Sequence, residues 1–347
     1  MKRPIVRLSS LQLTNIKNVK KGTIYMPNTV NKILSADKAE ILGIYGQNGS
    51  GKTAIVDALY FLQKVMIGAD FAQSLEDYMN MDSDTAEIFA DFNLFMNGTV
   101  FEIGYRLSLS REEKVVVISR ETLSGAKNEN GIRTNKTVFM DYKRDQTNTI
   151  FKPQKRLDEI LEENKDIKTD LIVARKMAQK SNCSYIFGES SRDIFCREYK
   201  NGFQQFSVII SSLSEFALKD LFVIRNTHSG VISGNFVLPM AFRIENDNMG
   251  AKGDFTVSLT EPILVDEERK NLLETIVERI NIVLYTIIPG LQATIKNYGK
   301  QSLDDGEEGW KLELMSKREG MKEIPIRMES EGIIKIISIL NALIQAF

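Results

Sequence analysis

The sequence predicts an α/β fold, and three observations lead to that prediction. Residues 46–53 match the pattern G-x-x-x-x-G-K-[ST], which places a phosphate-binding loop between a strand and a helix. Residues 86–121 form strand-like runs, the first two separated by an Asn-Gly pair, as in antiparallel hairpins. Residues 267–284 repeat apolar side chains at helical spacing. We therefore expect a mixed central sheet, an antiparallel meander and packed helices.

The loop is flanked as the pattern requires. Residues 41–45 are mostly apolar, which predicts a short buried strand. Apolar residues from 55 onward predict the inner face of a helix that extends to about Ile67. By chance alone the pattern is expected in about one chain in a hundred of this length. Its strand and helix neighbours favour a true nucleotide site.

Each residue type in the loop has a physical role. Glycines let the backbone fold into a nest of amide hydrogens around a phosphate, and the helix N-terminus adds partial positive charge. Lys52 reaches the outer phosphates as a mobile cation and is the expected catalytic residue, while the Thr53 hydroxyl suits Mg²⁺. The motif thus predicts ATP or another nucleoside triphosphate with Mg²⁺. The expected contact residues are Gly46, Asn48, Gly49, Ser50, Gly51, Lys52 and Thr53.

Composition excludes several classes of protein. The net charge of −1 does not indicate a globally basic nucleic-acid binder, although a local patch stays open. Cys183 and Cys196 have neither metal-ligand nor disulfide spacing, and the single histidine, His228, excludes a histidine-rich metal site. The sequence contains no uninterrupted run of about 18 apolar residues, so no membrane-spanning helix is predicted. A cytoplasmic protein without membrane contact is expected.

The order of elements suggests a chain made of three parts. The first, 1–150, holds two N-terminal strands over residues 5–26, the loop and the meander. The second, 151–225, is a helical insertion in which 153–178 is helical and 208–224 fits either helix or strand. The third, 226–347, holds β structure, the 267–284 helix, two more strands and a final apolar helix.

The last residues carry a second informative feature. Ser330 precedes a helix that is apolar on most sides from Ile333 onward, and by itself this is an ordinary N-cap. The segment Ser330-Glu331-Gly332 gains meaning only beside the phosphate loop. Beside a loop of this form, the segment becomes a candidate second site.

Three stretches give the chain its resemblance to a known family. They are Leu11–Asn18, the Gly46–Thr53 loop, and Ser330–Gly332, which is similar to a degenerate serine-x-glycine signature. The chain resembles ABC-type ATPase heads of the SMC and RecF group, and within it the OLD-like, AAA-family ATPases of bacterial phage-defence systems. The three stretches occur in the same order as in the family and span essentially the whole chain. Only the phosphate loop would identify the family by itself.

The resemblance implies a function. Two heads of this kind dimerise head to tail around ATP, so Ser330 and Gly332 of one copy would contact the terminal phosphate held by the other copy's loop. The head would then control an effector nuclease or toxin partner, in phage defence. Two alternatives stay open: a RecF-type or SMC-type ATPase bound to DNA, and a non-catalytic nucleotide-binding scaffold.

The catalytic carboxylate is harder to place. Ile263–Glu267 looks like a Walker B strand, yet it precedes the signature segment, whereas the family's strand follows it. Acidic residues are also favoured at a helix start, so Glu267 and Glu268 are expected to open a helix. The resemblance then implies a head truncated before Walker B, deficient in hydrolysis when isolated. The apolar final helix would lie uncovered and promote association.

Other candidates come from the family comparison. A glutamine usually senses magnesium and the terminal phosphate, and Gln179 is the candidate, although an exposed helix-end residue is an equal interpretation. Lys17 and Asn18 are expected near the adenine or ribose. His228 is expected in a loop without a chemical role, because turn-forming residues surround it.

Overall fold

A computed structural model gives the fold of the chain. It divides into two compact units, Met1–Val223 and Ile224–Phe347, which are described separately. The segment 151–225, expected as a helical insertion, contributes almost entirely to the first unit. The described residues are 3–71, 75–113, 115–129, 131–146, 151, 158, 166–195, 204–221, 223, 237–246, 249–259, 261–302 and 308–346. His228 and Cys196 lie outside them.

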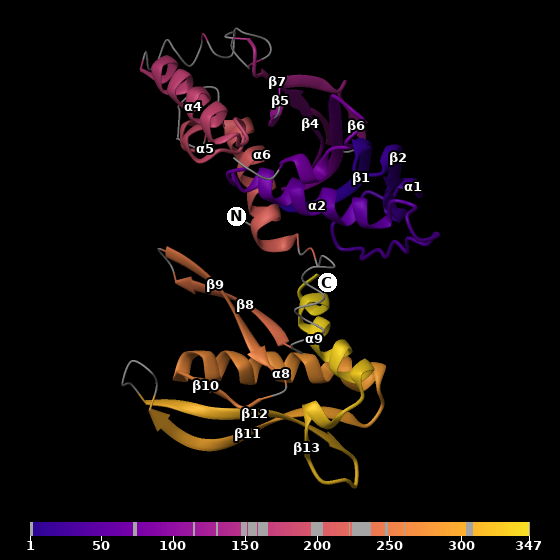
Figure 1. Cartoon of the computed structure of the whole chain (residues 1–347), viewed down its shortest axis with the longest axis vertical. Coiled ribbons are helices and arrows are strands. Elements are labelled where there is room, and N and C mark those ends of the chain that lie inside the picture. Colours follow the sequence, from indigo (N-terminus) through magenta and orange to yellow (C-terminus); the bar gives the residue numbers. More distant parts are fainter. Residues whose placement is uncertain are drawn as a thin grey trace. The chain divides into compact units, whose positions relative to one another are not determined.

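The first unit is built on an antiparallel sheet (Figure 1). Its order is β2-β1-β3-β4-β5-β6, and β7 also pairs with β5. The predicted Asn-Gly turn joins β3 to β4 with φ of +48° at Asn97 and +79° at Gly98, the left-handed values that this residue pair tolerates. The meander is therefore confirmed. The strands are β1 (Ile5–Ile16), β2 (Val19–Tyr25), β3 (Thr85–Met96), β4 (Thr99–Glu112), β5 (Val115–Glu129), β6 (Ile132–Arg133) and β7 (Thr137–Lys143).

Helix α2 (Lys52–Met66) anchors the core of the first unit. It ends within one residue of the predicted position, and its apolar stripe is buried as the spacing predicts. Phe61 lies at its centre, stacked on Tyr78 at 4.5 Å and edge-on to Phe71 at 5.1 Å between ring centroids. The helix that begins at the phosphate loop is thus fixed by packing at its middle and far end.

Three further helices of the first unit pack on the same core, whereas α1 (Pro27–Val30) has no buried residue. The three are α4 (Ile167–Ser181), α5 (Glu189–Phe195) and α6 (Gln204–Glu215), with a 3₁₀ turn at Leu75–Tyr78 and a π-helical turn at Phe216–Asp220. The apolar run that fitted helix or strand is α6 and the π-helical turn. Gln63 of α2 donates to the carbonyls of Ala217 at 3.0 Å and Leu221 at 2.5 Å, which holds that turn against α2.

The prediction of a buried strand at residues 41–45 is wrong. These residues have no regular secondary structure, and Ile41 is 80% and Tyr45 93% exposed. Every strand pairing in the described ranges is antiparallel, so the expected mixed sheet is not formed there. A strand needs a neighbour for its backbone groups, and no described strand pairs with residues 41–45. Apolar sequence alone therefore did not make this segment a strand.

In the second unit, α8 packs against a small antiparallel sheet of order β10-β12-β11, to which β13 is added, while α9 contacts α8 and β8 of a separate two-stranded sheet (Figure 1). Helix α8 packs on β11 and α9, and Leu273, Ile280 and Leu284 are buried there. Gly290, with φ of +79°, follows the end of α8, where a left-handed glycine is common. The elements are β8 (Val237–Asn246), β9 (Met249–Ser258), β10 (Ile263–Val265), α8 (Glu267–Ile287), β11 (Leu291–Ser302), β12 (Glu308–Arg318), β13 (Ile324–Pro325) and α9 (Glu331–Ala346).

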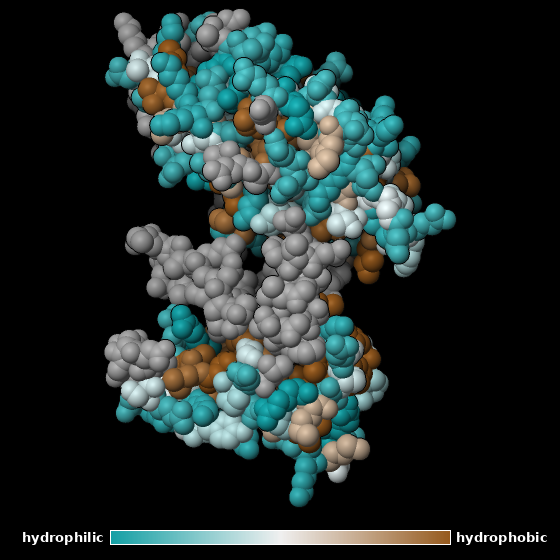
Figure 2. Space-filling model, viewed as in Figure 1, coloured by the Kyte–Doolittle hydropathy of each residue, from teal (hydrophilic) through white to brown (hydrophobic). Residues whose placement is uncertain are grey.

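The apolar face of α9 is covered within the unit, which corrects the expectation of an uncovered final helix. Ile334, Ile337 and Leu340 are at most 3% exposed and pack with α8 in one core. Figure 2 shows hydrophobic surface on the second unit, while the visible face of the first unit is mainly hydrophilic. In the described ranges, no helix is both long enough and apolar enough to cross a membrane.

Candidate nucleotide-binding site

The phosphate loop has the backbone shape that its glycines permit. Gly49 has φ of +82° and Gly51 has φ of +94°, in the left-handed region where a side chain is strained. Gly51 is the N-cap of α2, and the Ser50 amide donates to the Gln47 carbonyl at 3.2 Å. A Cβ on Gly46 would come within 2.8 Å of the Ser50 hydroxyl. The loop is therefore a tight concave turn at a helix start.

The Lys52 side chain bonds back to the start of the loop. Its ammonium donates to the Gly46 carbonyl at 2.6 Å and to the Gln47 carbonyl at 2.7 Å. An ammonium group has three donors, so one proton remains for a phosphate oxygen after these two bonds. The cation is thus held at the mouth of the loop, where a phosphate would lie.

The start of α2 is electrostatically suited to an anion. Its first turn contains no acidic residue, and its buried Asp57, one turn further on, is paired with Lys17. The aligned amides of the first turn carry partial positive charge, which favours phosphate. The backbone, Lys52 and the helix end together fit a triphosphate.

Thr53 is the residue that fits Mg²⁺. It is the second residue of α2 and is exposed beside the loop. In the described part of the chain, no three side chains of His, Cys, Asp or Glu gather as a metal site. A magnesium ion here would take the Thr53 hydroxyl and fill its remaining positions with phosphate oxygens and water, as Mg²⁺ commonly does.

The turn between β1 and β2 is the feature that sequence reasoning only partly found. Asn18 donates from its side-chain amide to the Gly49 carbonyl at 2.5 Å, and Lys17 pairs with Asp57. The sequence patterns gave Asp57 no predicted role at the site. The available signal was a carboxylate four residues after Thr53, on the face of α2 that the apolar stripe buries.

A pocket of about 480 Å³ opens beside this turn. Its volume falls in the range of small-ligand sites. It is lined by Lys17, Asn18, Glu76, Asp77, Met79, Asn80, Met81 and Asp82. The structure therefore brings the two residues expected near the nucleoside to the rim of a pocket next to the loop.

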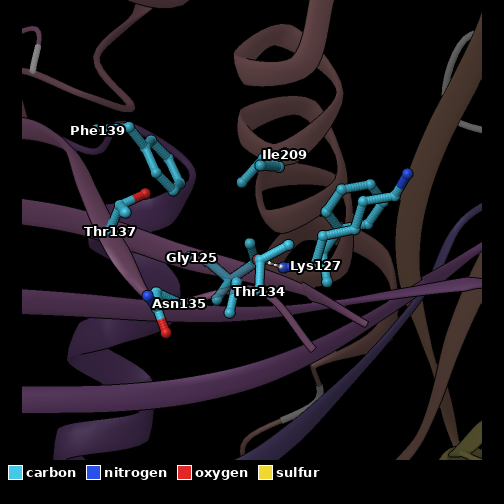
Figure 3. A pocket seen from close by; sticks show the side chains of 10 residues that line it. Gly125, Lys127, Thr134, Asn135, Thr137, Phe139 and Ile209 are labelled. Atoms are coloured by element: carbon cyan, nitrogen blue, oxygen red, sulfur yellow. Dashed lines mark hydrogen bonds between the residues drawn. The ribbon is translucent and has the colours of Figure 1, made fainter. Parts of the chain in front are cut away.

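A separate pocket of about 230 Å³ lies away from the loop residues (Figure 3). It is formed by β4, β5, the segment before β7 and α6, with Phe139 and Ile209 on its walls and the Lys127 amide donating to Thr134 at 2.9 Å. A Cβ on Gly125 would come within 2.8 Å of Phe139. None of the predicted site residues lines this pocket.

The structure does not bring Gln179 to the loop. Its side-chain amide donates to the Arg144 carbonyl at 2.7 Å, and Arg144 donates back to the Gln179 carbonyl at 3.1 Å. Arg144 follows β7, and three strands, β3, β4 and β5, lie between β7 and β1 in the sheet order. The described contacts give Gln179 a structural role, fastening α4 to the end of β7.

Ser330 and Gly332 lie at the start of α9 in the second unit. The Ser330 carbonyl accepts from the amides of Ile333 at 3.0 Å and Ile334 at 3.1 Å, and both Ser330 and Gly332 are exposed. A Cβ on Gly332 would meet no atom within 4 Å. The helix start is thus open at the surface.

The chain just before this helix start is held rigidly. Glu329 accepts from Arg318 at 2.6 and 2.8 Å and from the Ser316 hydroxyl at 2.7 Å. The Arg318 hydrogen bonds lower the pKa of Glu329 below its usual value, and the Ser316 bond adds to this. The neighbouring Arg327 pairs with Glu313 of β12. Two ion pairs therefore fix the segment that presents Ser330.

Comparisons with known proteins agree with this geometry. A family profile described as "AAA domain, putative AbiEii toxin, Type IV TA system" matches residues 41–168. The DNA replication and repair protein RecF of Shewanella sp. (strain W3-18-1) is 41% identical over 75 residues, or 21% of this chain and 19% of RecF. Over these residues the chain is similar to P-loop ATPases of the AAA and RecF type. RecF of Deinococcus radiodurans is 30% identical over 99 residues, or 28% of this chain and 24% of RecF.

The chain also aligns with solved structures over nearly all of its length. An Smc head domain bound to the C-terminal domain of ScpA, from Pyrococcus furiosus, is 14% identical, with 98% of this chain and 79% of that chain covered and a TM-score of 0.37. RecF-ATP of the RecFOR pathway is 12% identical, with coverages of 99% and 82% and a TM-score of 0.33. The sequence matches span about a fifth of the curated relatives' length.

The structure confirms that a helix starts at Glu267. Asp266 is the N-cap of α8, and its carboxylate accepts from the Arg269 amide at 2.7 Å. The preceding strand, β10, pairs only with β12 among the described strands. The resemblance of Ile263–Glu267 to a Walker B strand is therefore explained by a helix cap after a short strand.

A substitution at Asp266 separates the two interpretations. Asp266→Ala is expected to lower the free energy of unfolding of the second unit by about 1 kcal/mol, since the cap is lost. Asp266→Asn keeps the cap and is expected to leave stability unchanged. Both variants should bind ATP like the wild type, as measured by titration beside denaturant unfolding. Loss of magnesium-dependent nucleotide binding in the well-folded Asp266→Asn variant would contradict the helix-cap role.

Proposed function

We propose that the head binds ATP with Mg²⁺ at residues 46–53 and dimerises around it. Ser330 and Gly332 of a second copy would contact the terminal phosphate, because an exposed helix start favours an anion. The observation that carries the proposal is the loop itself, in which Lys52 closes a left-handed glycine turn at the start of α2. The nucleoside would lie in the pocket beside Lys17 and Asn18.

The chemistry of such a head is phosphoryl transfer. Lys52 and the loop amides would hold and neutralise the phosphates, and Thr53 would hold Mg²⁺, which supplies further charge neutralisation at the transferred group. A carboxylate that activates water is a separate requirement. The candidate for that carboxylate was the Ile263–Glu267 segment, in which Asp266 caps α8 instead. We therefore expect this chain to bind ATP without rapid multiple turnover. Persistent binding without turnover, even beside a second segment that supplies the carboxylate, would favour the scaffold alternative.

The biological role is proposed as control of an effector nuclease or toxin in phage defence. The support is the family profile, whose description names a type IV toxin–antitoxin system. We place this activity in the cytoplasm. Loss of protection against phage in cells that carry a Lys52→Ala allele, at unchanged protein level, is the expected result.

The dimer can be tested at Ser330. Ser330→Arg is expected to weaken ATP-dependent dimerisation at least tenfold, because a long cation at the helix start would occupy the space of the facing phosphate. Ser302→Arg, an exposed serine of the same unit, is the matched control and should dimerise normally. Sedimentation with ATP and Mg²⁺ measures both variants. Equal dimerisation of the wild type and Ser330→Arg would count against the composite site.

A RecF-type role on DNA is the second candidate, because the curated relatives are named DNA replication and repair proteins. Of the two basic clusters in the sequence, Lys152, Lys155 and Arg156 lie outside the described residues. In the other cluster, Lys17 is paired with Asp57, and Lys20 and Lys21 are exposed on β2. Duplex DNA binding that falls steeply with salt would favour this candidate.

A further inference from the structure

Three successive residues at the β1–β2 turn contact the phosphate loop or the helix α2 that follows it. Lys17 pairs with Asp57 of α2, and Asn18 donates to the Gly49 carbonyl at 2.5 Å. Val19 lies so close to Gly51 that a Cβ there would meet its Cγ2 at 2.6 Å. The turn therefore touches the apex of the loop, its last glycine and the helix behind it.

The turn is itself held from behind. The Lys17 amide donates to the Tyr78 carbonyl at 3.0 Å, and the Asn80 side chain donates to the Lys17 carbonyl at 2.5 Å. The Asn80 amide donates to the Asn15 carbonyl at 2.9 Å. Tyr78 in turn stacks on Phe61 of α2. The turn is thus a rigid support connected to the same helix that the loop begins.

The loop needs an external support of this kind. Its residues from Gly46 to Ser50 are exposed, so no burial of their own holds them in place. Glycine-rich backbone loses much conformational entropy when it is fixed. A binding site that is ordered before its ligand arrives avoids that cost on binding, which increases affinity.

We propose that Asn18, Lys17 and Asp57 are positioning residues that order the phosphate loop before nucleotide binds, an inference that rests on the proposed ATP site. Asn18 fixes the left-handed turn at Gly49 through its carbonyl. Asp57, only 3% exposed, holds the Lys17 ammonium and so fixes the turn against α2. The three residues act on the shape of the loop and through it on the phosphates.

Two probes separate this role from direct contact with the nucleoside. Asn18→Ala is expected to weaken binding of ATP and of inorganic tripolyphosphate by the same factor, about tenfold for one lost hydrogen bond to an ordered loop. A residue that contacts only adenine or ribose would weaken ATP alone. Asn28→Ala is the matched control, because Asn28 makes the same kind of bond to the Lys38 carbonyl, at 3.0 Å, away from the loop. It should bind both probes normally.

The ion pair is tested by a double-mutant cycle. Lys17→Met and Asp57→Asn should each weaken binding of both probes, and the double variant should be no weaker than Asp57→Asn alone, since one interaction is removed. Lys17 is 32% exposed at its side chain and tolerates substitution, so Lys17→Met carries the test if Asp57→Asn does not fold. Additive losses would overturn the coupling.

A third measurement does not depend on binding. Amide hydrogen exchange at residues 49–52 of the nucleotide-free protein should become faster in Asn18→Ala, at unchanged exchange in the core of α2. Unchanged exchange together with binding of both probes within twofold of the wild type would overturn the inference. If the wild type itself bound neither probe, the proposed ATP site would fail, while the exchange result would still decide whether the turn orders the loop.

Discussion

Lys52→Ala is expected to weaken ATP binding by about 100-fold or more. The substitution removes the cation at the mouth of the loop and also the two bonds to Gly46 and Gln47 that close it. A charge-assisted hydrogen bond contributes about 1.5–3 kcal/mol, and about 2.7 kcal/mol corresponds to a 100-fold change in affinity. Calorimetric titration with ATP and Mg²⁺ measures the effect.

Lys64→Ala is the matched control for this prediction. Lys64 lies in the last turn of the same helix, where its ammonium is 5.4 Å from the Tyr60 ring centroid. Its replacement should leave ATP affinity unchanged. If Lys52→Ala bound ATP within threefold of the wild type, the loop would not be the nucleotide site, and the proposed function would have to be abandoned.

Glu121→Ala is expected to lower the free energy of unfolding of the first unit by about 3 kcal/mol. Glu121 is fully buried and accepts from the Tyr105 hydroxyl at 2.6 Å, the Ser184 hydroxyl at 2.5 Å and the Tyr185 amide at 2.6 Å. Removing the carboxylate leaves these buried donors without their acceptor, which is costly. Denaturant unfolding measures the change.

The same carboxylate gives the first unit a pH dependence. Burial raises the pKa of Glu121 above its usual value, and the bonds from Ser184, Tyr105 and the backbone offset this only in part. The folded state therefore holds the proton more tightly than the unfolded chain. Its contribution to stability is fully present below the usual carboxyl pKa and is lost as pH rises through the raised value.

Glu121→Gln isolates this effect, because the amide cannot titrate and its oxygen still accepts hydrogen bonds. The difference in unfolding free energy between wild type and Glu121→Gln should shift in favour of Glu121→Gln as pH rises through that window. A difference that is constant with pH would show that Glu121 does not titrate differently in the folded state.

Local patterns in the sequence determined much of the fold. The alternation and the Asn-Gly turn predicted β3 and β4, and helical spacing predicted α2 and α8 within a few residues. Glu267 and Glu268 were correctly assigned to a helix start, because acidic residues in a first turn are a local signal. The capping bond of Asp266 was found only in the structure. The phosphate loop was also readable, since glycine, lysine and threonine at fixed spacing define its chemistry.

Tertiary structure decided what depends on distant partners. Residues 41–45 are apolar but form no strand, because a strand requires a neighbour that its own sequence cannot supply. From its sequence the final helix was expected to be uncovered, but in the structure it packs with α8 in one core.

The support of the nucleotide site is the clearest case. The loop sequence by itself determines that Gly46–Thr53 can hold a phosphate. The pairing of Lys17 with Asp57 and the bond from Asn18 to Gly49 join residues more than 30 positions apart. Gln179 and Arg144, which bond to each other, are also far apart in the sequence, so no local pattern predicts their contact. Such contacts arise only when the whole unit packs, because the energy that selects them is shared among many residues of the core.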